Sequence, residues 1–159
     1  MMATDISYEA LNILNADYAG CIDDDLLEQW PSFFTEKCLY KITTVENYRG
    51  GMLAGLVYAD SQRMLSDRVT ALREANVYER QRYRHVIGMP RITGRDDQGV
   101  QADTPFLVAR IMRGGRTDLF ASGKYVDRVT VNAAGELKLA QRIVVCDSDS
   151  FDTLVAIPF

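Results

Sequence analysis

Turn signals divide the second half of the chain into a series of strands, and this division constrains the fold more than any other feature of the sequence. Gly114-Gly115 is a hairpin signal, because glycine adopts positive φ without steric cost, and residues 132–135, Asn-Ala-Ala-Gly, form a second turn signal. The segments between these signals are rich in strand-forming residues. The sequence therefore predicts antiparallel strands over 76–88, 104–113, 118–131 and 136–147, a loop over 90–99, and a final short strand or docked tail over 153–159.

The first half of the chain follows a helical period instead. From Ser7, apolar residues recur at near-helical spacing and predict an amphipathic helix that ends near Gly20, with the buried positions Tyr8, Leu11, Leu14, Tyr18 and Ile22. Asp25 and Glu28 stand three residues apart, as in the capping box that begins a helix. This second helix should be short, because Pro31 interrupts it.

A strand and a longer helix are expected next. Residues 38–48 are rich in β-branched and aromatic side chains and predict a strand that Gly50-Gly51 ends. A helix should begin near Asp60 or Ser61 and end at about Ala75, with its buried side formed by Met64, Leu65, Val69 and Leu72. The aromatic residues Trp30, Phe33 and Phe34 are expected in the core.

Helices in the first half and a meandering sheet in the second predict an α+β fold, with the helices packed on one face of a curved antiparallel sheet. A length of 159 residues, 47% of them hydrophobic, suits one domain over 1–159. Its helices would lie at about 5–35 and 60–75 and its sheet at about 38–48 and 76–159. A strongly curved sheet leaves a concave mouth that can hold a ligand or a neighbouring subunit.

Within this scheme, the segment 67–88 is unusually polar. Read at period two, one face of its strand carries Tyr78, Arg80, Arg82 and Arg84, and the other carries Glu79, Gln81, Tyr83 and His85. Charge on an exposed edge strand that discourages aggregation is one explanation. The alternative, which we favour because both faces are polar, is a strand whose guanidinium groups pair with carboxylates of a partner chain.

The charges along the chain are also unevenly distributed. Residues 1–36 contain eight acidic residues and no Lys or Arg, whereas 67–88 contain five Arg and three acidic residues; the formal net charge is −4. This asymmetry suits contacts between subunits, such as a head-to-tail ring, better than it suits nucleic acid, whose phosphates favour a basic surface. For the acidic segment alone, a solvated surface is the simpler interpretation.

The single histidine limits the chemistry that this chain can perform by itself. A 2-His-1-carboxylate iron site and a Rieske cluster each need two histidines, so this chain can build neither alone. The sequence contains no GxSxG elbow and no phosphate-binding glycine loop. An acid–base pocket remains open, in which a curved sheet brings an aspartate together with Tyr40, Tyr58, Tyr83 and His85.

The cysteines and the hydropathy of the chain indicate its compartment. Cys21, Cys38 and Cys146 are odd in number and follow no metal-binding pattern, so they are expected to be reduced core residues of a cytoplasmic protein. No run of about 18 apolar residues is present to span a membrane, and the N-terminus lacks the features of a signal peptide. We therefore expect a soluble protein that contacts neither membrane nor nucleic acid.

Five segments of the sequence are recognisable: DYAGCIDDDLLEQWPSFFTEKCLYKIT, YADSQRMLSDRVTALREANVYERQRYRHVIG, TPFLVARIM, LFASGKYVDR and RIVVCDSDSFDTLVAIPF. Together they resemble, over nearly the whole chain, the small (β) subunit of bacterial aromatic-ring-hydroxylating dioxygenases, which are Rieske non-haem iron enzymes. The resemblance is strongest to the subgroup that acts on aromatic carboxylates such as terephthalate or salicylate. The loop 95–102 departs from the family pattern.

The resemblance implies a cone-shaped α+β fold of the ketosteroid isomerase, scytalone dehydratase and cystatin type. It also implies an α3β3 hexamer in which each large (α) subunit carries a 2Fe-2S Rieske cluster and a mononuclear Fe(II). Electrons from NADH reach the complex through a reductase or ferredoxin, and O2 is used to hydroxylate an aromatic carboxylate. The small subunit would have no catalytic residue, cofactor or metal of its own and would hold the trimer together.

Matched to the family pattern, eight residues fall in the segment that makes subunit contacts: Arg68, Arg73, Glu74, Tyr78, Arg80, Arg82, Arg84 and His85. The C-terminal LVAIPF matches an apolar end that should be docked. Two other functions remain as alternatives. One is a stand-alone isomerase or dehydratase with a Tyr, His and Asp pocket, and the other is a ligand-binding module without catalysis.

Overall fold

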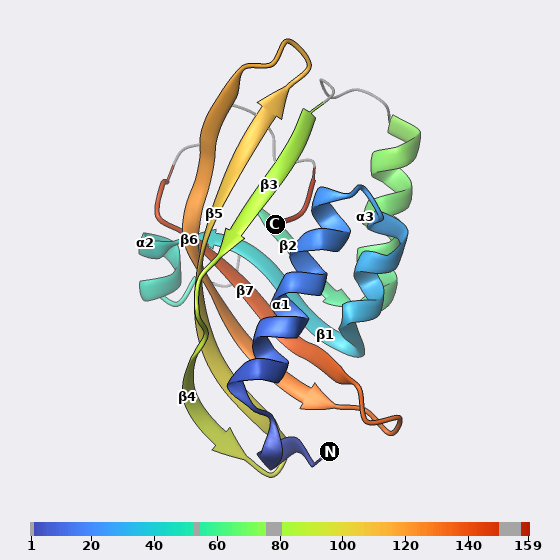
Figure 1. The fold of residues 1–159 in the computed structure, drawn as a ribbon, viewed down its shortest axis with the longest axis vertical. Coiled ribbons are helices and arrows are strands. Elements are labelled where there is room, and N and C mark those ends of the chain that lie inside the picture. The colour runs from blue at the N-terminus through green and yellow to red at the C-terminus, as the bar shows by residue number, and fades with distance from the viewer. Residues whose placement is uncertain (1, 53–54, 76–80, 150–156) are drawn as a thin grey trace.

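The computed structural model describes residues 2–52, 55–75, 81–149 and 157–159, in which a seven-stranded sheet curves around two helices (Figure 1). The strands are β1 (Phe34–Thr44), β2 (Val57–Ser61), β3 (Gln81–Ile87), β4 (Arg91–Asp96), β5 (Gly99–Met112), β6 (Thr117–Val131) and β7 (Leu137–Cys146). The helices are α1 (Tyr8–Asp23), α2 (Val45–Arg49) and α3 (Gln62–Ala75), with the short 3-10 helices η1 (Ala3–Asp5) and η2 (Leu27–Phe33).

The strands follow the order β2-β1-β7-β6-β5-β3, and β4 pairs with the part of β5 that β3 leaves free. Neighbouring strands are antiparallel except β1 and β7, which run parallel. The predicted α+β class is therefore confirmed, but the sheet is mixed and not antiparallel throughout. The two paired strands are about 100 residues apart, and no local sequence pattern indicates that they pair. The parallel pair could therefore not be predicted from the sequence.

Strand β4 was predicted as part of a loop, and that prediction is wrong. Pro90 and Gly94 are turn-forming residues that made the segment resemble a loop. In the structure, Pro90 lies just before the strand, and the register of β4 against β5 shifts between Ile92 and Gly94. Both residues are tolerated because β4 lies at the edge of the sheet, where an irregular ladder disrupts only one neighbour.

The helices begin at residues whose side chains cap them. Ser7 Oγ accepts a hydrogen bond from the backbone N–H of Ala10 at 3.1 Å, and Ser61 Oγ accepts one from Met64 N–H at 3.2 Å. Helix α1 continues to Asp23, three residues beyond the predicted end. On α3, Leu65 and Val69 are buried as predicted, whereas Met64 is exposed.

Two predictions about the segment before α3 need correction. The strand predicted over 38–48 begins earlier, at Phe34, and ends at Thr44, whose side chain caps the short helix α2. The capping box of Asp25 and Glu28 is absent, because the following helix is a 3-10 helix with no side-chain cap. Asp25 instead adopts a positive φ of 59°.

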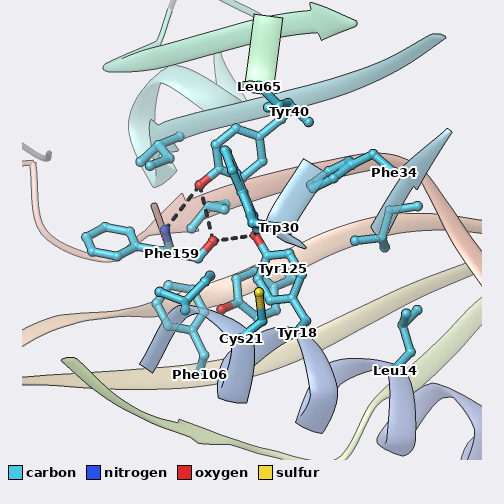
Figure 2. Packing of buried hydrophobic residues seen from close by; sticks show 14 of the residues in the cluster. Leu14, Tyr18, Cys21, Trp30, Phe34, Tyr40, Leu65, Phe106, Tyr125 and Phe159 are labelled. Carbon is cyan, nitrogen blue, oxygen red and sulfur yellow. Dashed lines mark hydrogen bonds between the residues drawn. The ribbon is translucent and has the colours of Figure 1, made fainter. Parts of the chain in front are cut away.

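An aromatic cluster fills the space between α1, η2 and the inner face of the sheet (Figure 2). Trp30 and Phe34 are fully buried as predicted, and the rings of Trp30 and Tyr40 meet edge to face with their centroids 5.1 Å apart. Phe159 enters the same cluster. Its main-chain oxygen accepts hydrogen bonds from the hydroxyls of Tyr18 at 2.6 Å and Tyr40 at 3.1 Å, so residues 157–159 are docked as expected.

Candidate functional site

Strand β3 presents two different faces. Arg82 and Arg84 are exposed on the outer face, which points away from α1, whereas Tyr83 and His85 are buried on the inner face. The partner of the inner face belongs to the same chain, because His85 Nδ1 lies 2.7 Å from Asp23 Oδ1 at the end of α1. The buried face of β3 thus has a partner in α1 that the sequence analysis did not identify.

Six of the eight residues predicted as subunit contacts are described by the structure, and they do not share one surface. Arg68, Arg73 and Glu74 lie on α3, which packs on η2, β1 and β2. Tyr78 and Arg80 lie outside the described residues. Arg82 and Arg84 lie on the outer face of β3, and the side chain of His85 is buried.

Arg73 binds two carboxylates of its own chain. Its guanidinium group lies 2.9 Å from Asp25 Oδ1 and 2.7 Å from Glu28 Oε1, and it also donates to the main-chain oxygen of Asp25 at 2.8 Å. These bonds tie the end of α3 to the start of η2. The residues that looked like a capping box thus receive a side chain from 45 or more positions further along the chain.

We expect Arg73→Ala to lower the free energy of unfolding at pH 7 by less than about 1 kcal/mol, because solvent screens these surface ion pairs. The hydrogen bond from Arg73 lowers the pKa of Glu28. A lowered carboxyl pKa adds stability above the unfolded pKa of about 4.3, and this contribution is lost as the pH falls through the folded pKa. Urea denaturation should therefore give a smaller difference between wild type and variant at pH 3 than at pH 7. An equal difference at both pH values would contradict this role of Glu28.

The outer face beside Arg82 and Arg84 carries exposed apolar side chains. Val86 of β3 pairs directly with Leu107 of β5, and Leu119 of β6 lies in the row of Arg84. Val86 is 61% exposed and Leu119 is 69% exposed. A contiguous apolar surface with charged residues beside it is the usual composition of a protein interface.

The acid–base pocket that the sequence left open is assembled only in part. Asp23, Tyr83 and His85 lie together, whereas Tyr58 is exposed on β2 and the Tyr40 hydroxyl is bonded to Phe159. His85 Nε2 and the Tyr83 hydroxyl are buried without a hydrogen-bond partner among the described residues. Beside them lies a cavity of ≈ 310 Å³ that Asp23 and Tyr83 line and His85 does not.

A buried ion pair occupies the inner face of β6 and β7. Arg142 donates to both carboxylate oxygens of Asp127, at 2.9 and 2.7 Å, and to the side-chain oxygen of Asn15 at 2.6 Å. Its guanidinium carbon lies 4.2 Å from the ring centroid of Tyr18 and 3.9 Å from that of Tyr125. These side chains fill the space in which a curved sheet could bind a ligand.

The charge on Arg142 is maintained by its partner. Burial works against the charged form, but the Asp127 carboxylate outweighs this effect and raises the pKa of Arg142. Burial also raises the pKa of Tyr18 to about 12. The sequence analysis missed this cluster; the signal that could have revealed it is a pair of charged residues at inward positions of otherwise apolar strands.

The three cysteines are free and buried, as expected. Burial raises the pKa of Cys21 and of Cys38 to about 11 and that of Cys146 to about 12. At neutral pH these thiols are protonated and therefore poor nucleophiles or metal ligands.

Within the described ranges, no group of three or more His, Cys, Asp or Glu side chains is placed to hold a metal ion. The side chains that the structure describes thus do not fit an iron cofactor. No helix in the described part of the chain is long and apolar enough to cross a membrane.

Comparisons with known proteins agree with this arrangement. The sequence profile described as "Ring hydroxylating beta subunit" matches residues 18–153. The chain is 54% identical over 144 residues to beta subunit 1 of the terminal oxygenase component of terephthalate 1,2-dioxygenase from Comamonas sp, covering 91% of this chain and 93% of that relative.

Solved structures place the fold in the same group. A beta subunit assigned to an aromatic-ring-hydroxylating dioxygenase of Novosphingobium aromaticivorans superposes with a TM-score of 0.87 at 39% identity, over 96% of each chain. A protein assigned as a scytalone dehydratase from the same organism gives a TM-score of 0.68 at 15% identity, over 92% of this chain and 89% of that chain. The second similarity concerns the fold alone.

Proposed function

Since the chain belongs to the family of ring hydroxylating beta subunits, we propose that it holds an oxygenase complex together and takes no part in the chemistry. The family assignment confirms the resemblance found in the sequence. The chain is the small subunit of an aromatic-ring-hydroxylating dioxygenase, an oxidoreductase. Its partner is a large subunit, and the iron cofactors of the enzyme belong to that partner.

The proposed complex is an α3β3 hexamer that uses O2 to hydroxylate an aromatic carboxylate such as terephthalate or salicylate. The identity with a terephthalate dioxygenase subunit supports this substrate class. The large subunits would carry the 2Fe-2S Rieske cluster and the mononuclear iron, and a reductase or ferredoxin would deliver electrons from NADH. We also propose that the complex works in the cytoplasm, which three unpaired cysteines suit.

One observation carries the structural role: apart from the cavity beside Tyr83, side chains fill the inner face of the sheet, and the outer face near Arg82 and Arg84 carries exposed apolar side chains. We propose that Arg82 and Arg84 contact partner chains directly, because a guanidinium group can pair with a carboxylate through two parallel hydrogen bonds. His85 and Arg73 instead hold β3 and α3 in position within the chain. Such contacts would fix the distance between neighbouring large subunits. They would thereby determine how far electrons must travel from one large subunit to the next.

The alternative of a stand-alone isomerase or dehydratase has one observation in its favour. The Asp23 carboxylate orients His85 as it would orient a general base, and His85 Nε2 has no hydrogen-bond partner among the described residues. Against it, the Tyr83 ring beside His85 packs on the rings of Phe120 and Phe159. Measurable turnover of a cyclic ketone or alcohol by the purified chain, lost in His85→Ala, would favour the alternative.

The test of the structural role combines Arg82→Ala with Arg84→Ala in the chain co-expressed with its large subunit. We expect the hexamer to dissociate at least ten-fold more readily, because each interfacial charge pair truncated contributes about 2–5 kcal/mol to association. The melting temperature of the isolated small subunit should change little, since both side chains are exposed. Sedimentation velocity and thermal unfolding give the two measurements.

Arg63→Ala is the matched control, because Arg63 is an exposed arginine on α3. It should leave both the hexamer and the melting temperature unchanged. An intact hexamer in the double variant, or a loss of thermal stability as large as the loss of assembly, would rule out the direct role of Arg82 and Arg84.

A further inference from the structure

The outer face of the sheet has two separate regions of exposed apolar side chains, one at each end of the strand order. The first, here called the arginine region, consists of Arg82, Arg84, Val86, Leu107 and Leu119 on β3, β5 and β6. The second, here called the tyrosine region, consists of Met52, Leu56, Tyr58 and Asp60 at β2 and the segment before it.

The tyrosine region follows from the alternation of β2. Val57 and Ala59 are buried against β1 on the inner face, so Leu56, Tyr58 and Asp60 point outward. Leu56 is 55% exposed and Tyr58 is 47% exposed. An exposed carboxylate thus stands two residues from an exposed tyrosine on the last strand of the sheet.

Helix α2 separates the two regions. It packs on β1 and β7 from the outer side (Figure 1), where it leaves Thr43 and Val145 fully or almost fully buried. Lys41, which pairs with Tyr58 on the outer face, is buried and donates to the main-chain oxygen of Met52 at 2.7 Å. The outer face over β1 and β7 is therefore covered within the chain, whereas the apolar side chains of the two regions stay exposed.

We infer that the arginine region of one copy of this chain packs on the tyrosine region of a second copy. The charges are complementary, because the first region offers two guanidinium groups and the second offers the carboxylate of Asp60. A guanidinium group also binds the face of a tyrosine ring such as that of Tyr58. In both regions the charge adjoins apolar side chains, which gives a contact an apolar centre.

The position of the two regions determines the kind of assembly. They are different surfaces at opposite ends of one sheet, so each copy can use both at once. Such a head-to-tail contact repeats from copy to copy and forms a ring where the rotation closes. This inference rests on the proposed self-association of small subunits, and it assigns the large subunit to other surfaces.

A reciprocal charge exchange tests the contact. Arg82→Asp and Asp60→Arg should each weaken self-association of the full-length small subunit at least ten-fold, because each places like charges opposite one another. The double variant should recover wild-type association to within about three-fold, an interaction energy that the double-mutant cycle isolates. Arg82 is preferred to Arg84, because the guanidinium group of Arg84 lies 3.9 Å from Asp23 and a reversed charge there would repel a carboxylate of its own chain.

Sedimentation equilibrium of the small subunit, alone and bound to its large subunit, provides the readout, with Arg63→Asp as the control for charge reversal at an exposed arginine outside the two regions. Unchanged self-association in the single variants, or no recovery in the double variant, would overturn the inference. Loss of large-subunit binding in Arg82→Asp, with self-association intact, would also overturn it but would leave the proposed function standing. Failure of the wild-type chain to bind any large subunit would count against the proposed function instead.

Discussion

Replacing Arg142 by methionine is expected to lower the free energy of unfolding by about 3–5 kcal/mol, the range for breaking one side of a buried ion pair. Asp127 is buried, and both of its carboxylate oxygens bond to Arg142. Without the guanidinium group, the carboxylate must remain charged without a partner or take up a proton. The side-chain oxygen of Asn15 loses a donor as well.

The double variant Arg142→Met with Asp127→Leu separates this effect from a loss of packing. Because it removes both charges, it should recover at least half of the stability that Arg142→Met loses. Arg128→Met is the matched control, since Arg128 also pairs with an aspartate, Asp96, but at the surface. Urea denaturation should place this control within about 1 kcal/mol of wild type. Equal stability losses in the two single Arg variants would contradict a special role for burial.

Phe159→Ala is expected to lower the free energy of unfolding by about 3–5 kcal/mol, as is usual for removing a buried phenylalanine ring. The ring centroid of Phe159 lies 5.7 Å from those of Tyr83 and Phe120 and 6.4 Å from that of Phe106. All four rings line the same end of the inner face. Phe159 is fully buried, so removal of its ring leaves a cavity and deprives the neighbouring rings of their contacts.

Phe159→Leu keeps most of the volume and should lose clearly less stability than Phe159→Ala, by about half or less. Ile13→Ala is the control for a large, exposed apolar residue outside the core, and its effect should stay within about 0.5 kcal/mol. Chemical denaturation of the isolated small subunit checks all three variants. A loss for Phe159→Ala no larger than that for Ile13→Ala would show that Phe159 adds nothing to the core.

Local signals predicted the parts of the fold that local physics determines. Ser7 caps α1, and Gly115 and Gly135 take the positive φ values of 89° and 81° that their turns require. The parallel pairing of β1 with β7 is different, because it depends on where the two strands meet in space. Strand β4 was missed for a related reason, since its pairing with β5 in space outweighs the local preference of its residues for turns.

The residues of the candidate site were also predicted only in part. Period-two alternation correctly separated Arg82 and Arg84 from Tyr83 and His85. It could not reveal that Asp23, 62 residues earlier, would satisfy His85, or that Arg73 would bind two acids 45 or more residues away. A lone charged residue such as Arg142 gives no hint of its partner either, since only the register of β6 and β7 brings Asp127 beside it.

The carboxylate of Asp23 also restricts how this chain can polymerise. Among the residues that the structure describes, β3 ends the strand order and has no strand along one of its edges. Free backbone groups at such an edge would allow strands of other molecules to extend the sheet without limit. The backbone N–H of His85 donates instead to Asp23 Oδ2 at 2.8 Å, and α1 lies along this edge. Other chains are thereby prevented from adding a strand at β3. The number of chains that can join is then determined by contacts between side-chain surfaces and not by hydrogen bonds between strand edges.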